Sequence, residues 1–195
     1  MISHAGRFVF VHASRTGGST FERMAGVPIT SDDRTRHLGN TDFPGKHGHF
    51  QFYRSTYPEA FDRYFKFTIV RNPFDRLHSS WKWRTRTVGD LRGISLRRFI
   101  ESRSPGYAYA AKFQLDGLSI GESVARFDYV GRFEHLAETL TFLQRRLGLP
   151  DGPAPSSNST GPGRYQEDYD DATIDLVRRS YADDLALFGY DFEPA

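Results

Sequence analysis

The stretch from Phe8 to Thr20 constrains the fold of this chain more than any other part of its sequence. A short apolar run, Phe8–Val11, predicts a β-strand. Small and polar residues follow, with Gly17 and Gly18 side by side, and we expect a helix to begin near Phe21. In a strand–turn–helix unit of this kind, backbone N–H groups converge and glycine lets an anion approach the main chain. The stretch therefore predicts a phosphate-binding loop.

This loop differs from the loop of nucleoside triphosphatases. Their pattern, G-x-x-x-x-G-K-[ST], has a lysine directly before the hydroxyl residue that binds magnesium. Here Ser19 follows Gly18 directly, and the cation, Arg15, precedes the glycines. By itself, the stretch is also consistent with a plain Gly-Gly turn between an edge strand and a helix.

A second strand is followed by a different anion-binding pattern. Residues 64–70 are β-branched or aromatic almost throughout, as in the central strands of parallel sheets. Arg71 follows directly, and Pro73 suits the first turn of a helix over residues 74–83, which carries Ser79 on its second turn. Since open parallel sheets bind ligands at the carboxyl ends of their strands, we expect the two segments to be neighbours that hold two separated phosphates.

Strands and helices alternate along the remaining chain. We expect residues 46–50 to return the chain to the sheet after a long surface loop, and a short strand over residues 127–130. Leucines spaced by three and four predict an amphipathic helix over residues 136–147, and one final helix should start at Asp170 or Asp171 and end at Gly189. The pattern predicts an α/β fold: a three-layer sandwich around a central, mostly parallel sheet, in one domain spanning residues 1–195.

Composition narrows the class of protein. The chain is 38% hydrophobic and has no cysteine, which excludes disulfides and thiolate metal sites. No apolar run approaches the roughly 18 residues that a membrane helix needs, and we expect no signal peptide, because the first strand is expected within ten residues of Met1. We expect a cytoplasmic protein, with an excised lumenal domain as the alternative. Basic residues dominate between residues 71 and 104, which suits an anionic ligand or a solvated surface; no nucleic-acid-binding module accompanies them.

Four segments in order resemble the sulfotransferases that use 3′-phosphoadenosine 5′-phosphosulfate (PAPS). Residues 10–20 resemble their 5′-phosphosulfate loop, and residues 67–79, with Arg-x-Pro and a serine eight residues after the arginine, resemble their 3′-phosphate motif. Residues 129–136 and 181–190 are also similar to that family. The resemblance is nearest to the carbohydrate branch that includes heparan 2-O-sulfotransferase and many small bacterial enzymes, and it implies a P-loop-like nucleotide-binding fold.

The resemblance assigns roles to individual residues. The residues that would cradle the 5′-phosphosulfate are Thr16, Gly17, Gly18, Ser19 and Thr20. Arg71 and Ser79 would hold the 3′-phosphate. A loop before the last helix would close over the nucleotide, or is an ordinary surface loop; its candidate contacts are Asn158, Ser159, Arg164 and Tyr165. A site made of cations and backbone N–H groups favours transfer of an anionic group that requires no metal.

Arg15 departs from the family pattern, which usually has lysine at this position. Arginine keeps the positive charge but stays protonated at any relevant pH, so it cannot act as a general acid. If the chain is an active enzyme, Arg15 is expected to stabilise charge on the leaving phosphate by electrostatics alone. The alternative is that the substitution lowers activity.

The acceptor hydroxyl needs a base, and His49 is our candidate. The segment His47-Gly48-His49 resembles the His-Gly-His of the 2-O-sulfotransferase branch, in which a histidine at this position is the base. An imidazole pKa near 6.5 suits proton abstraction at neutral pH. His47 is the expected helper or substrate contact. A structural role, or a zinc site with a third histidine, is the alternative, although this spacing without cysteine or carboxylate is a weak zinc signal.

The sequence therefore predicts a sulfotransferase that moves a sulfuryl group from PAPS to a hydroxyl and releases PAP. The acceptor is expected to be a carbohydrate or another small hydroxylated molecule. A non-catalytic protein that binds PAP or PAPS is the main rival, because Arg15 replaces the family lysine. A metal-dependent kinase is a weaker rival, because the lysine of the triphosphatase loop is missing. Nothing in the sequence indicates the oligomeric state.

Overall fold

The computed structural model describes residues 1–26, 50–87, 89–102, 127–150 and 165–193. The chain divides into two compact units. The first contains Met1–Val70 and Gln114–Asn158, and the second contains Arg71–Phe113 and Ser159–Ala195. The prediction of a single domain over residues 1–195 stays a prediction.

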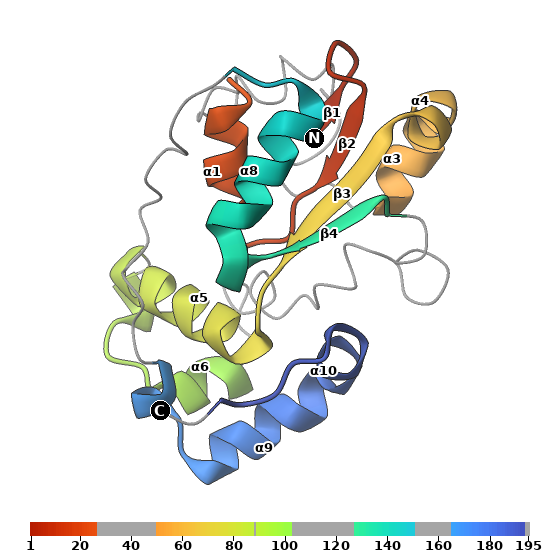
Figure 1. The fold of residues 1–195 in the computed structure, drawn as a ribbon. Helices are drawn as coiled ribbons and strands as arrows, with labels where there is room; N and C mark the ends of the chain where they lie inside the picture. Colours follow the sequence, from red (N-terminus) through yellow and green to blue (C-terminus); the bar gives the residue numbers. More distant parts are fainter. Residues whose placement is uncertain (27–49, 88, 103–126, 151–164, 194–195) are drawn as a thin grey trace. The chain divides into compact units, whose positions relative to one another are not determined.

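The first unit is built on a four-stranded sheet (Figure 1). Its strands, in spatial order, are β1 (Ile2–Ser3), β2 (Phe8–Val11), β3 (Phe65–Val70) and β4 (Tyr129–Arg132). Strand β1 is antiparallel to β2, whereas β2, β3 and β4 are parallel to one another. Phe10 lies opposite Phe67, and Thr68 opposite Val130. The predicted α/β fold with a mostly parallel sheet is confirmed.

One face of this sheet is covered by α1 (Gly18–Met24) and α8 (Leu136–Leu147). Side chains alternate between the two faces of a strand, so every second residue of β2 and β3 points toward these helices. The rings of Phe10 and Phe67 stack at 4.9 Å between centroids. The buried residues of this cluster are Met1, Phe8, Phe10, Phe21, Phe67, Ile69, Leu140 and Leu143. The leucine spacing thus predicted α8 and its buried face correctly.

The other face carries α3 (Phe50–Thr56) and α4 (Pro58–Arg63). Lys66 alternates with the core-facing residues of β3, and its ammonium group lies 5.7 Å from the ring centroid of Phe61 on α4. Phe50 and Tyr53 are each 1% exposed, one helical turn apart. The prediction that residues 46–50 return the chain to the sheet is wrong for Phe50, which begins a helix because Phe50 and Tyr53 bury one face of it; residues 46–49 lie outside the described residues.

The second unit is helical. Its elements are α5 (Pro73–Thr87), η1 (Gly89–Leu91), α6 (Leu96–Glu101), η5 (Tyr165–Asp168), α9 (Asp171–Ser180) and α10 (Ala182–Phe188). Their core contains Phe74, Leu77, Leu96, Phe99, Ile100, Tyr165, Val177 and Tyr181. None of the helices in the described ranges is long and apolar enough to cross a membrane.

The C-terminal helix was predicted correctly at its start but not along its length. The Asp170 side chain accepts a 2.7 Å hydrogen bond from the Thr173 amide, the expected N-cap. The prediction of one helix up to Gly189 is wrong, because the backbone leaves helical geometry at Tyr181. The ring of Tyr181 is 1% exposed. Two short helices, α9 and α10, therefore share the buried Tyr181 at their junction.

Truncation of Leu143 tests the packing of α8 on the sheet. Leu143 is fully buried, so Leu143→Ala should lower the free energy of unfolding by about 2–5 kcal/mol. Glu138→Ala, on the exposed side of the same helix, should change it by less than about 0.5 kcal/mol. Urea titration followed by circular dichroism measures both. Equal effects would contradict the assigned face of α8.

Candidate functional site

The loop between β2 and α1 has an unusual backbone. Arg15 has a φ of 64° and Gly17 a φ of 84°, both in the left-handed region. A non-glycine residue there costs of order 1 kcal/mol, and such residues cluster at functional sites. Gly17 is the N-cap of α1, and its carbonyl accepts a 2.9 Å hydrogen bond from the Thr20 amide. The chain thus turns sharply at the end of the strand, as an anion-binding loop requires.

Gly18 is required for a different reason: its main chain lies too close to the His12 ring to leave room for a side chain. A Cβ atom added to Gly18 would overlap Nε2 and Cδ2 of His12 and would lie 2.7 Å from Cε1. The His12 ring is buried, stacks on Phe10 at 5.1 Å, and its Nδ1 lies 2.8 Å from Oε1 of Glu22. The first turn of α1 therefore rests on a fixed imidazole. Sequence reasoning identified Gly18 but missed Glu22 and the role of His12.

Buried and partly exposed residues alternate through the loop. Thr16, Gly18 and Thr20 are buried, whereas Arg15, Gly17 and Ser19 are partly exposed. The Thr16 hydroxyl donates a 2.8 Å hydrogen bond to the Ala13 carbonyl within the loop. Thr16 therefore stabilises the turn through its side chain, and any contact it makes with a ligand would come from its backbone. The partly exposed residues are the loop's candidates for side-chain contact with an anion.

Arg71, the first residue after β3, belongs to the second unit. Its guanidinium group forms a two-point ion pair with Asp75, with Nη2 at 2.6 Å and Nε at 2.8 Å from the two carboxylate oxygens. Two parallel N–H···O bonds hold the guanidinium plane in one orientation. Ser79 lies on α5 and is 5% exposed. The second predicted phosphate contact is thus a cation that is already oriented by its own helix.

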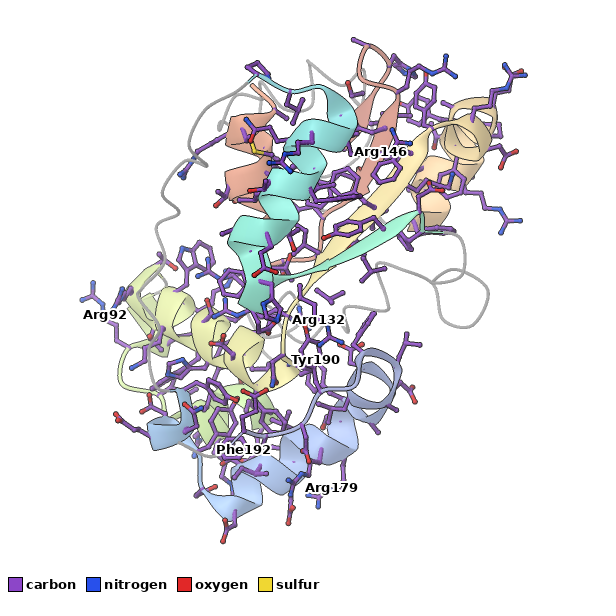
Figure 2. The ribbon with its side chains drawn as sticks, viewed as in Figure 1. Arg92, Arg132, Arg146, Arg179, Tyr190 and Phe192 are labelled. Carbon is purple, nitrogen blue, oxygen red and sulfur yellow. The ribbon has the colours of Figure 1, made fainter. Side chains whose placement is uncertain are left out.

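Asn72 fixes the turn between Arg71 and α5. Its Oδ1 accepts a 3.1 Å hydrogen bond from the Phe74 amide, and its Nδ2 donates a 2.8 Å bond to the Asp191 carbonyl. Phe192, labelled in Figure 2, packs its ring against Phe74 at 5.2 Å. The C-terminal segment therefore supports the position of Arg71. Sequence reasoning missed this contact, because its partners lie 119 residues apart.

His78, next to Ser79, forms a charged cluster with η5. His78 Nε2 lies 2.8 Å from Asp168 Oδ2, and the Lys82 ammonium group lies 3.2 Å from the same oxygen. Burial lowers the pKa of His78, and the hydrogen bond that His78 donates to Asp168 only partly opposes this. Burial acts to raise the pKa of Asp168, but hydrogen bonds from His78 and Lys82 outweigh it and lower that pKa. The cluster fastens η5 to α5.

Several predicted site residues have no described position. His47, His49, Asn158, Ser159 and Arg164 lie outside the described residues. Tyr165 is described, and it is 8% exposed in the core of the second unit, where its hydroxyl accepts a 3.4 Å hydrogen bond from the Glu193 amide. The role of Tyr165 as a nucleotide contact stays a prediction. Across the described ranges, no cluster of His, Asp and Glu side chains suits a metal ion.

A family comparison decides what kind of chain this is. The model of the Sulfotransferase family matches residues 1–191, nearly the whole length. This chain belongs to the Sulfotransferase family. The resemblance read from the sequence is thereby confirmed at family level, and family membership supports sulfuryl transfer in general.

The fold of this sulfotransferase is also found in a solved structure. The crystal structure of a sulfotransferase from Alicyclobacillus acidocaldarius matches with a TM-score of 0.50, covering 95% of this chain and 96% of that chain. The two sequences are 16% identical, so the likeness shows a shared fold. A search of curated proteins found no match.

The pKa of His78 predicts how stability depends on pH. The folded protein holds this imidazole neutral below its unfolded pKa of about 6.5, so the unfolded state binds more protons there. The free energy of unfolding should therefore fall as the pH drops below 6.5. His78→Gln keeps a donor for Asp168 but does not titrate, and should make this decline shallower.

Urea titrations between pH 7.5 and 5 measure the effect. His135→Gln, an exposed histidine with a distant carboxylate partner, is the matched control and should follow the wild-type curve. An unchanged slope in His78→Gln would contradict the assignment.

Proposed function

We propose that this sulfotransferase transfers a sulfuryl group from PAPS to a hydroxyl of a carbohydrate or another small hydroxylated acceptor. The observation that carries the proposal is the loop between β2 and α1. Its left-handed turn at Gly17 and the close packing of Gly18 bring the main chain into the form that a phosphosulfate loop needs, in a chain of the Sulfotransferase family. The lack of cysteine is in keeping with the cytoplasm as the location of the reaction.

Two sets of residues would hold the donor. Backbone N–H groups of residues 16–19, with the Ser19 hydroxyl, would bind the 5′-phosphosulfate, while the Thr20 amide closes the turn by donating to the Gly17 carbonyl. Arg71 and Ser79 would bind the 3′-phosphate, and the carboxylate of Asp75 keeps the guanidinium group of Arg71 oriented for this. No contact in either set requires a metal. Donor binding of this kind contributes positioning and electrostatic stabilisation, as in phosphoryl transfer.

The transfer is an in-line displacement at sulfur. The acceptor oxygen forms a bond to sulfur while the bond from sulfur to the 5′-phosphate oxygen breaks, and the electron pair of that bond leaves with PAP. The acceptor's proton moves to the imidazole of His49, with His47 as helper or substrate contact. Arg15, held at a left-handed φ in the loop, stabilises the charge that develops on the leaving phosphate. Because an arginine donates no proton at neutral pH, PAP leaves as the full anion.

Arg15 also favours one other function, a protein that binds PAP or PAPS without turnover. An assay of transfer of a labelled sulfuryl group from PAPS to a panel of sugars and small alcohols separates the two functions. The proposed enzyme labels at least one acceptor, whereas a binding protein labels none although it retains PAP. ATP with magnesium, which a kinase would prefer, should not displace PAP.

Arg71→Ala tests the nucleotide site. Loss of a charge-assisted contact to the 3′-phosphate should weaken PAP binding by about ten- to a hundredfold in calorimetry. Arg97→Ala removes a half-exposed arginine that also pairs with a carboxylate four residues away, and should leave the affinity unchanged. Equal PAP affinity in Arg71→Ala and wild type would refute this part of the site.

His49→Ala tests the base. Removal of a general base should lower the rate of sulfuryl transfer by about 10²–10⁴-fold, while the dissociation constant for PAP stays within a factor of two or so. His135→Ala, on the surface, is the control for loss of a histidine. Full activity in His49→Ala would exclude His49 as the base.

A further inference from the structure

We propose that His12, oriented by Glu22, is a positioning residue that sets the backbone of the phosphosulfate loop. The inference rests on the proposed function and deepens it. It adds a buried histidine–carboxylate pair to the loop residues that would touch the donor. The pair contacts no ligand itself and acts through the main chain of Gly18 and Ser19.

The His12 ring is fixed by neighbours from two elements. Its Nδ1 lies 2.8 Å from Oε1 of Glu22, and the side chains are 2% and 4% exposed. Its plane stacks on the Phe10 ring at an angle of 19°, and Phe10 is itself stacked on Phe67 in the sheet. A buried imidazole held by a hydrogen bond and by stacking has one accessible orientation.

The opposite edge of this ring supports Gly18. The ring atoms nearest to the site of a Gly18 Cβ are Cδ2, Nε2 and Cε1, whereas Nδ1 is the atom that faces Glu22. Any rotation of the imidazole would push against the main chain at Gly18. The hydrogen bond between His12 and Glu22 fixes the orientation of the ring, and the ring in turn fixes the position of the Gly18 main chain.

The pair also joins the two ends of the loop. His12 follows the last residue of β2, and Glu22 lies one turn into α1. Their hydrogen bond closes the segment of residues 13–21 into a ring, which holds the left-handed conformations at Arg15 and Gly17. Backbone donors of an anion site must be positioned to about 0.5 Å, and buried hydrogen bonds behind the site provide this accuracy.

The charge of Glu22 gives a second reason for the pair. A buried carboxylate one helical turn from a phosphosulfate loop would repel the anionic donor. The imidazole stands between Glu22 and Gly18, donates its Nδ1–H to the carboxylate, and so separates that charge from the ligand. A loop that uses a buried acid for rigidity needs this histidine at position 12.

Calorimetry with three probes tests the proposal: PAP, adenosine 5′-monophosphate and adenosine 3′-monophosphate. Glu22→Ala removes the acceptor of the hydrogen bond, and we expect it to weaken PAP and the 5′-monophosphate by about tenfold or more. It should leave the 3′-monophosphate unchanged, because the loop does not hold that phosphate. Glu22→Gln keeps an acceptor oxygen and should recover most of the affinity.

Controls separate positioning from stability. Titrations are run well below the melting temperature of each variant, and Glu138→Ala, an exposed glutamate near a histidine on α8, should match the wild type. The proposal is overturned if Glu22→Ala binds the 5′-monophosphate as tightly as wild type, or loses both monophosphates equally. If Glu22→Ala does not fold, His12→Asn replaces it, because asparagine keeps a donor for Glu22 but lacks the ring edge beneath Gly18, and the same pattern is expected.

Failure of the proposed sulfuryl-transfer function would be distinguishable from failure of the positioning role of His12 and Glu22. If the wild type binds none of the three probes, the donor assignment fails, and the pair is then judged by ¹⁵N–¹H spectra of the ligand-free protein. Glu22→Ala, or His12→Asn in its place, should shift the amide signals of Gly18 and Ser19 more than those of β3. Unchanged loop amides would overturn the positioning role.

Discussion

The packing of the Gly18 main chain on the His12 ring is the contact on which the candidate site depends. It places the start of α1 against the His12 ring that follows β2, because Gly18 has no side chain of its own to hold them apart. The turn that joins the two elements must then be short and sharp, which explains the left-handed backbone at Arg15 and Gly17. The stacked rings of Phe10 and Phe67 carry this arrangement into the core of the sheet. The candidate anion site is therefore supported by aromatic packing.

The second predicted phosphate site is organised by a different device. Arg71 takes its orientation from Asp75 on its own helix, and Asn72 ties the turn to the C-terminal segment. A cation at this position, in place of the carboxylate that a magnesium-dependent nucleotide site uses, suits a ligand that arrives without a metal. Each candidate phosphate contact is therefore supported by a neighbouring residue that is not itself a predicted contact.

Local patterns in the sequence predicted much of the fold. The apolar runs of β2 and β3, the leucine stripe of α8 and the Asp170 cap all act within a few residues of one another, so they can be read from the chain. The helix at Phe50 and the break at Tyr181 could not be predicted, because burial against distant residues decides them. The sequence pattern of the loop also identified its two glycines, Gly17 and Gly18.

The supporting residues of the site were not visible in this way. Residue types such as those of Glu22, Asn72 and Asp168 are common on protein surfaces and in helices, so their identity alone indicates no role. Their hydrogen-bond partners lie 10, 119 and 90 residues away in the sequence, respectively, and only the fold shows them. The assignment of His49 as base still rests on a resemblance of three residues.

A crystal structure of the protein with PAP would show which atoms hold the two phosphates. We predict the 5′-phosphate within hydrogen-bond distance of the Gly18 and Ser19 amides, and the 3′-phosphate on Arg71 and Ser79. A 5′-phosphate that makes no contact with the loop between β2 and α1 would contradict this prediction.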